Sequence, residues 1–143
     1  MDNTLLRNNF IILLTLFLIA CQSNPAIKVF DNKNLRSSQY AKLEAPTGTL
    51  ILEIDGKELN YAPQYHILPG ERKLHLMVSA FKNDKAYKVG EIDISFNATA
   101  GHSYQVKSLA TTAQTHKDFN KKSNDFLWIE DVTLDIVVAG KKP

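Results

Sequence analysis

The sequence predicts an all-β fold, a small antiparallel β-sandwich or open barrel of about six to eight strands behind an N-terminal signal helix. Three observations predict it. Apolar and polar residues alternate with a period of two in several segments from about Tyr40 onward. The turn-forming pairs Asp55-Gly56 and Pro69-Gly70 separate these segments. After Cys21, no segment keeps a helical period over three turns.

The alternation appears in four segments, and in each we expect one set of apolar residues to face the core and its neighbours to face water. The expected inward-facing residues are Leu50, Leu52 and Ile54; Leu74, Leu76 and Val78; Ile92, Ile94 and Phe96; and Tyr104 and Val106. Near the end of the chain, residues 126–129 and 134–138 predict two more strands. The first of these has four apolar residues in a row, so it is expected to be buried on both faces.

Turn-forming residues divide the predicted strands. Asp55-Gly56 predicts a hairpin turn. Pro69-Gly70 predicts a type II turn, because proline fixes φ at one central position and glycine supplies a positive φ at the next. Gly90 and Gly101 are expected to open the two strands that follow them, and the polar residues 111–124 predict a long, mobile hairpin loop.

The N-terminus has the pattern of a targeting segment. Residues 10–20 are apolar except for Thr15, and a helix needs about 20 apolar residues to cross a bilayer, so this run suits a signal peptide. It ends in Leu18-Ile19-Ala20-Cys21, which resembles the lipobox of bacterial lipoproteins. That resemblance implies cleavage before Cys21 and attachment of a diacylglycerol and acyl chains such as palmitate to this residue. Two or three such chains would anchor the protein firmly to a membrane.

The chain is therefore divided into a signal peptide (1–20), a lipidated flexible tether (21–38) and a β-sandwich domain (39–143). Ile27, Val29 and Phe30 are the tether residues that could dock on the domain. In lipoproteins of Gram-negative cells, an aspartate after the lipidated cysteine marks retention at the inner membrane. This chain has Gln22 there, so in such a host we expect the periplasmic face of the outer membrane.

Composition excludes some function classes. The formal net charge is +2, and the signal peptide contains one acid and one base, Asp2 and Arg7, so the remaining chain keeps this value. Neither this charge nor an envelope location favours nucleic acid as a partner. Cys21 is the one cysteine of the chain, and with a lipid on it none remains for a disulfide, a metal or redox chemistry. We expect no cofactor beyond the covalent lipid.

Two stretches also resemble small envelope β-sandwich domains of the PEGA-like type. Residues 54–57 contain a strand followed by Asp-Gly, and residues 65–76 contain Leu-Pro-Gly followed by a strand. Residues 98–106 contain an Ala-Gly-x-x-Tyr strand start, and residues 128–131 end in Glu-Asp. This resemblance covers residues 48–135 and implies a non-enzymatic surface or scaffold module. It carries over no functional residues.

Candidate chemical sites are few. His66 and His75 flank Pro69-Gly70 and could approach each other across a hairpin. Zinc takes three or four ligands, so we interpret them as surface histidines and assign no metal site. Glu91 and Asp93 lie on one face of a predicted strand and are interpreted as exposed solubility residues rather than an acid/base pair. No nucleophile elbow and no phosphate-binding loop occurs, so we assign no catalytic residue.

Two sets of residues are binding candidates. Lys117, Lys121 and Lys122 accompany Phe119 in the polar loop, where they could contact anionic headgroups or phosphates, or simply be solvated. The tyrosines form the second set, with Tyr61 and Tyr65 as the candidates retained and Tyr40 and Tyr87 as further suspects. Tyrosines on a sheet face can stack on sugars or receive a partner, or they can cover a small core with the hydroxyl in water.

The sequence thus favours a lipid-anchored, non-catalytic binding or structural module of the cell envelope, with an envelope protein or a glycan as partner. The mechanism would be recognition by a sheet face, an edge strand or the polar loop. The alternative is a small ligand carrier or enzyme with a pocket inside the sandwich, which would require converging polar groups around a cavity.

Overall fold

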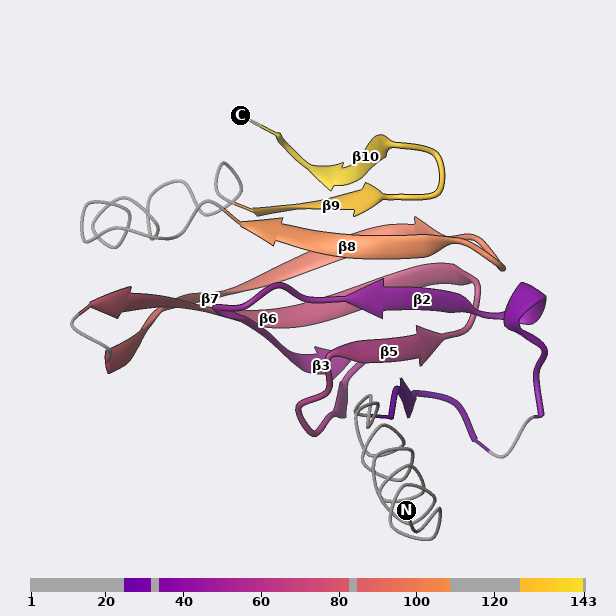
Figure 1. Ribbon diagram of the computed structural model, residues 1–143, viewed down its shortest axis with the longest axis horizontal. Helices are drawn as coiled ribbons and strands as arrows, with labels where there is room; N and C mark the ends of the chain where they lie inside the picture. Colours follow the sequence, from indigo (N-terminus) through magenta and orange to yellow (C-terminus); the bar gives the residue numbers. More distant parts are fainter. Residues whose placement is uncertain (1–24, 32–33, 83–84, 109–126, 143) are drawn as a thin grey trace, which may run out of the picture.

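The computed structural model describes residues 25–31, 34–82, 85–108 and 127–142, and within these ranges the chain forms ten strands in two sheets (Figure 1). The strands are β1 (Ile27–Lys28), β2 (Ala41–Glu44), β3 (Thr49–Ile54), β4 (Lys57–Glu58), β5 (Gln64–Ile67), β6 (Gly70–Lys82), β7 (Lys85–Ala98), β8 (Ser103–Ser108), β9 (Leu127–Asp131) and β10 (Ile136–Gly140). A 3₁₀ turn, η2 (Ser37–Gln39), precedes β2. The predicted signal helix and the predicted loop at 111–124 lie outside the described residues.

The two sheets pack as a small β-sandwich that is not closed into a barrel, which confirms the predicted fold class. Sheet A has the order β1-β5-β2-β8-β9-β10, and sheet B has the order β4-β3-β6-β7. Most neighbours are antiparallel, but β1 pairs with β5 and β2 pairs with β8 in parallel. Sheet A is therefore mixed. The alternation of residues shows which face of a sheet a side chain takes. It does not show whether the paired strand runs parallel or antiparallel, so the sequence did not predict the two parallel pairs.

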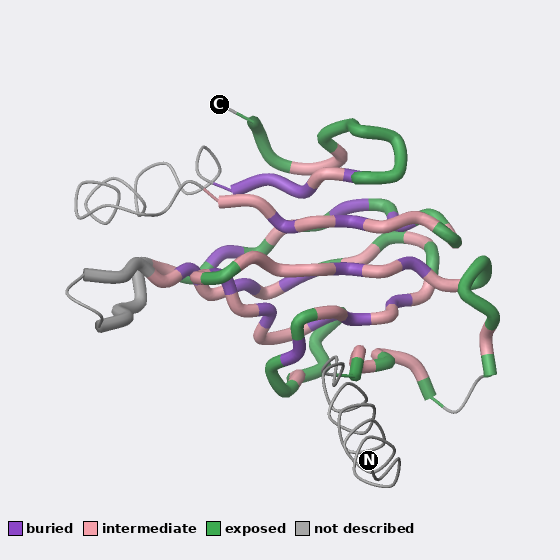
Figure 2. Tube along the Cα trace, viewed as in Figure 1, coloured by how far each residue is buried: buried purple, intermediate pink, exposed green. Residues whose placement is uncertain are grey.

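An apolar core fills the space between the sheets, and Figure 2 shows how buried residues alternate with less buried ones along the central strands. Leu74, Leu76 and Val78 are fully buried, as predicted, and so is Val106. Each such side chain contributes about 1.5–3 kcal/mol of burial free energy. Leu127, Trp128 and Ile129 are all buried, which confirms that β9 is covered on both faces.

The predicted facing of β3 is wrong in its first half. Ile51 and Ile54 are both buried, whereas Leu50 and Leu52 are only half-buried. The register with β6 shifts between Ile51 and Glu53, which is a β-bulge. A bulge adds one residue to one strand, so the residues on either side of it fall out of strict alternation.

The structure confirms the hairpin turn at Asp55-Gly56 and corrects the prediction for Gly90. Asp55 and Gly56 have φ of 55° and 77° and join β3 to β4, as a hairpin turn with positive φ at both central residues requires. Pro69-Gly70 carries the chain from β5 in sheet A to β6 in sheet B, and Gly70 has the positive φ expected there, 107°. Gly90 does not open a strand, because it lies inside β7 next to a register shift between Val78 and Ser79.

The segment before β2 docks on the domain over part of its length. Ile27 pairs with Tyr65 and Lys28 pairs with His66, so β1 adds a short edge strand to sheet A. The amide of Val29 continues the pairing by donating to the carbonyl of His66, at 2.9 Å. Ile27 and Val29 also pack against the core. Within the stretch 21–38 that the sequence assigns to a flexible tether, these residues are thus fixed to β5.

Candidate functional site

Exposed apolar side chains gather on the β9–β10 hairpin, at the edge of sheet A opposite β1. Among the residues whose side chains the structure describes, which exclude 80–82 and 85–89, five large apolar ones are exposed, and four of them lie here. They are Val132, Leu134, Ile136 and Val137, exposed by 49%, 57%, 49% and 39%. We call these four residues the C-terminal edge. Several exposed apolar side chains on one hairpin of a small domain are typical of an interaction site.

The backbone of β10 is also accessible for pairing. In the described chain β10 is the last strand of sheet A and pairs through its backbone with β9 alone. An edge strand presents unpaired N–H and C=O groups, to which a further strand can be added. The pairing with β9 shifts register between Val137 and Ala139, so the first two residues of β10 are set apart from the rest by a bulge. Leu134, predicted to belong to this strand, lies in the turn before it.

The far half of β10 turns towards sheet B. Ala139, Gly140 and Lys141 line a hollow of about 370 Å³ whose other wall includes Ile94 and Ser95 of β7. Gly140 has a φ of 72°, and a Cβ there would lie 2.8 Å from the Cα of Trp128. Only glycine allows β10 to approach β9 this closely. The close approach of β10 to β9 therefore depends on a glycine at position 140.

A buried carboxylate holds the turn of the hairpin. Asp131 is 2% exposed, and its Oδ1 accepts hydrogen bonds from the amides of Thr133, at 2.9 Å, and Leu134, at 3.3 Å. Its Oδ2 accepts from Nδ1 of His102, at 2.7 Å. Burial alone raises the pKa of the Asp131 carboxyl, but these three hydrogen bonds outweigh it, so the pKa lies below its ordinary value. The carboxylate is therefore ionised and His102 is the donor.

Two hydrogen bonds to Ser103, the first residue of β8, also hold this turn. The amide of Val132 donates to the carbonyl of Ser103, at 2.9 Å, and the amide of Ser103 donates to the hydroxyl of Thr133, also at 2.9 Å. Sequence reasoning missed this network. His102 and Asp131 are 29 residues apart, and no local pattern pairs them. The one available signal was an aspartate directly before a Val-Thr-Leu segment, since Asp often caps turns with its own side chain.

A second cluster, of charged residues, lies on the outer face of sheet B. His75 donates from Nδ1 to Asp93, at 2.8 Å, and its Nε2 lies 3.7 Å from a carboxylate oxygen of Glu91. Lys73 contacts the other oxygen of Asp93, at 3.0 Å. Hydrogen bonds from His75 and Lys73 lower the pKa of the Asp93 carboxyl. Lys73, His75 and Asp93 line a hollow of about 240 Å³ together with Glu53 and Gly56.

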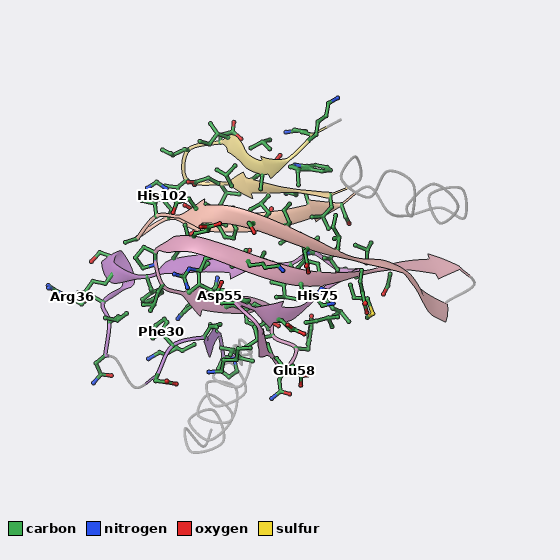
Figure 3. The ribbon with its side chains drawn as sticks, turned by 180° about the vertical axis from the view of Figure 1, so that it is seen from behind. Phe30, Arg36, Asp55, Glu58, His75 and His102 are labelled. Atoms are coloured by element: carbon green, nitrogen blue, oxygen red, sulfur yellow. The ribbon has the colours of Figure 1, made fainter. Side chains whose placement is uncertain are left out.

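This charged cluster lacks the geometry of a catalytic or metal centre. Both nitrogens of His75 face carboxylates, so neither is paired with a hydroxyl or thiol that could act as a nucleophile. Over the described ranges, no three residues among His, Cys, Asp and Glu are grouped so as to hold a metal ion. His66 and His75 do not face each other across a hairpin, because β5 and β6 belong to different sheets. Figure 3 shows His75 well separated from His102 as well.

The structure places the predicted binding residues as follows. Tyr61 is 73% exposed in the loop between β4 and β5. Tyr65 is 1% exposed: its hydroxyl donates to the carbonyl of Asn60, at 2.9 Å, and accepts from the amide of Ala62, at 3.0 Å. Tyr65 is thus a core residue, and this role replaces the binding role considered for it. Tyr40 stacks on His66 with ring centroids 4.3 Å apart. Cys21, Lys117, Phe119, Lys121 and Lys122 lie outside the described residues.

The comparisons with known proteins add no identity. Within the described ranges, no helix combines the length and the apolar character that crossing a membrane requires. No protein-family model, no curated protein and no solved structure matches this chain.

Proposed function

We propose that this protein is a lipid-anchored, non-catalytic binding module of the bacterial cell envelope. The lipobox-like Leu18-Ile19-Ala20-Cys21 after an apolar run supports the anchor. The exposed C-terminal edge supports the binding role, and it is the observation that carries the proposal. The partner is a protein that adds an extended segment to β10, with apolar side chains meeting Ile136 and Val137.

The chemistry of the C-terminal edge favours a protein segment over a glycan. Sugars are bound by exposed aromatic faces and several converging polar groups, whereas these four side chains are aliphatic. The aromatic residue of β9, Trp128, is 7% exposed, and its indole N–H donates to Glu130, at 2.9 Å. Aliphatic side chains beside an unpaired strand edge fit the alternating apolar residues of a β-strand.

The alternative, a ligand carrier or enzyme with an internal pocket, has less support. The hollow over Glu53, Lys73, His75 and Asp93 lies on the outer face of sheet B, and two of these residues are exposed. The space between the sheets is occupied by a contiguous apolar cluster that includes Leu43, Leu76 and Ile129. A small molecule released from the purified protein and identified by mass spectrometry would favour this alternative.

The anchor is tested by Cys21→Ser. We expect this variant to lose diacylglycerol labelling and to leave the membrane fraction, whereas Ser23→Ala, two residues further on, keeps both. Membrane fractionation and mass spectrometry of the N-terminal peptide provide the readout. A Cys21→Ser protein that still sediments with membranes rejects the lipid anchor.

The docking edge is tested by photo-crosslinking. A benzophenone amino acid at Ile136 should capture one protein in cells, whereas the same group at Asn97, exposed on β7, should not. The captured protein is then purified, and its affinity is measured directly. Ile136→Lys should weaken binding about tenfold or more, because a charge at an apolar contact costs about 1.4 kcal/mol or more. Asn97→Lys should leave Kd unchanged, and equal weakening by both variants would reject the edge as the site.

A further inference from the structure

We propose that the β1 edge of the sandwich, together with the loop from Leu59 to Pro63, rests on the lipid surface, so that the C-terminal edge points away from the bilayer. This inference rests on the lipid anchor proposed above. It assigns an orientation and a membrane-contacting surface, neither of which the anchor requires. Figure 1 places β1 and the loop before β5 at one side of the molecule and β10 at the other.

The first argument is the length of chain between the anchor and the domain. Cys21 and Pro25 are four residues apart, and an extended chain covers at most about 3.6 Å per residue, which gives a reach of about 14 Å. Directly after Pro25 the chain is held on the domain, because Ile27 and Lys28 pair with β5 and the amide of Val29 donates to the carbonyl of His66. Acyl chains on Cys21 therefore hold this side of the sandwich within about 14 Å of the membrane surface.

The second argument is the surface found next to that anchor. Pro25 and Ile27 from the N-terminal segment line a hollow of about 320 Å³ with Tyr61, Ala62 and Pro63 from the loop between β4 and β5. All five are apolar or aromatic. Tyr61 is 73% exposed, more than any other large apolar residue whose side chain the structure describes. Tyrosine is favoured at membrane interfaces because its ring enters the apolar boundary while its hydroxyl stays in water.

The third argument is the rigidity of the loop that presents Tyr61. The buried hydroxyl of Tyr65 bonds to the carbonyl of Asn60 and to the amide of Ala62, the residues on either side of Tyr61. The backbone around Tyr61 is thus held by the core, and its side chain is directed outward. A contact surface held in this way loses little conformational entropy when it meets the membrane.

The strand order of sheet A then fixes where the C-terminal edge lies. Five strand spacings separate β1 from β10 in the order β1-β5-β2-β8-β9-β10. Neighbouring strands lie about 4.8 Å apart, so the two edges are about 24 Å apart across the sheet. With β1 at the lipid surface, β10 is presented to the envelope compartment, where a partner segment can reach it.

Spin labelling of the full-length, lipidated protein tests the orientation. Cys21 is the only cysteine and its sulfur carries the lipid, so a thiol-specific nitroxide labels an introduced cysteine alone. Tyr61→Cys and Ile136→Cys are the matched positions, since both side chains are exposed and apolar. Each labelled protein is placed in vesicles of phosphatidylethanolamine and phosphatidylglycerol, and its collisions with oxygen and with a water-soluble nickel chelate are measured.

We expect the label at position 61 to collide more with oxygen and less with the nickel chelate than the label at position 136, which should behave as in free solution. Equal nickel accessibility at the two positions overturns the proposed orientation, provided that mass spectrometry shows lipid on Cys21. A label at position 136 that collides more with oxygen and less with the nickel chelate than the label at position 61 overturns it as well. A protein without lipid on Cys21 would reject the anchor itself, so the two failures are distinguishable.

Discussion

His102 and Asp131 form a hydrogen bond of 2.7 Å that joins the connection between β7 and β8 to the turn between β9 and β10. The histidine is partly exposed, whereas the carboxylate is buried and also accepts two amides of its own turn. The exposed C-terminal edge is thus built on a buried, ionised group. The position of the C-terminal edge depends on that group.

Asp131→Asn should lower the free energy of unfolding by about 2 kcal/mol, because it replaces a charged acceptor that holds three donors in a buried site. Urea unfolding at neutral pH measures the loss. Asp135→Asn is the matched control: it lies in the same exposed turn with a φ of 56°, which asparagine tolerates well. It should change stability by less than about 0.5 kcal/mol. Similar losses in both variants would contradict the role assigned to Asp131.

The same carboxylate makes stability sensitive to acid. The pKa of Asp131 is below its ordinary value of 3.8 in the folded protein, so the stability it provides is complete above that value. As the pH falls through the folded pKa, the carboxylate takes up a proton and this contribution is lost. The difference in stability between the wild type and Asp131→Asn should therefore shrink in acid. A difference that stays constant down to the lowest pH at which both proteins fold would argue against it.

His66 gives a pH dependence in a higher range. Burial, and then the charges of Lys42 and Lys28, lower the pKa of its imidazole from the ordinary 6.5. Its Nδ1 is buried without a partner, so protonation would create a buried donor with no acceptor. The unfolded chain binds a proton more readily than the folded one, so stability is complete above pH 6.5 and falls as the pH drops below it.

Two measurements test this behaviour. NMR titration should give His66 a pKa below 6.5, and the fall in unfolding free energy below that pH should be smaller in His66→Gln. Tyr40 should keep its contact with β5 in the folded protein, since it stacks on the neutral ring of His66. An upward shift in the pKa of His66 would contradict the assigned effect of the two lysines.

Tyr65→Phe should cost about 1–2 kcal/mol of unfolding free energy, because removal of a buried hydroxyl leaves the carbonyl of Asn60 and the amide of Ala62 without their partner. Tyr61→Phe removes a hydroxyl from an exposed ring and should be neutral. Urea unfolding compares the two. Burial is the main cause that raises the pKa of the Tyr65 hydroxyl above its ordinary value. An alkaline absorbance titration of the wild type should therefore show a tyrosine that ionises at a higher pH than the others, and this tyrosine should be missing in Tyr65→Phe.

The sequence predicted the fold class because alternation and turn chemistry are local. Alternation predicted the facing of Leu74, Leu76 and Val78 correctly: they lie in a long regular strand, and all three are buried. Alternation failed to predict the facing of Leu50 and Leu52 in β3, because a bulge before Glu53 changes it. The position of a bulge depends on the partner strand, and a single strand's sequence does not contain it.

The candidate site was less accessible to sequence reasoning. Pro69-Gly70 marks a turn in any β protein, but only the pairing of β5 with β2 and of β6 with β7 reveals that it connects two sheets. That change of sheet separates His66 from His75. Ile136 and Val137 belong to a segment expected to form a strand, and their exposure follows from its position at the end of sheet A. An edge position is a property of the whole sheet.

Gly140→Ala separates the packing of β10 from the cost of its backbone conformation. Both Gly140 and Gly56 have positive φ, 72° and 77°, which costs an alanine about 1 kcal/mol. A Cβ at Gly56 would meet nothing within 4 Å, whereas one at Gly140 would lie 2.8 Å from the Cα of Trp128. Gly56→Ala should therefore lose about 1 kcal/mol of unfolding free energy, and Gly140→Ala more, because β10 must move away from β9. Hydrogen exchange should show faster exchange of β9 and β10 amides in Gly140→Ala alone. Faster exchange in both variants, or in neither, would show that close packing at Gly140 does not hold the C-terminal edge in place.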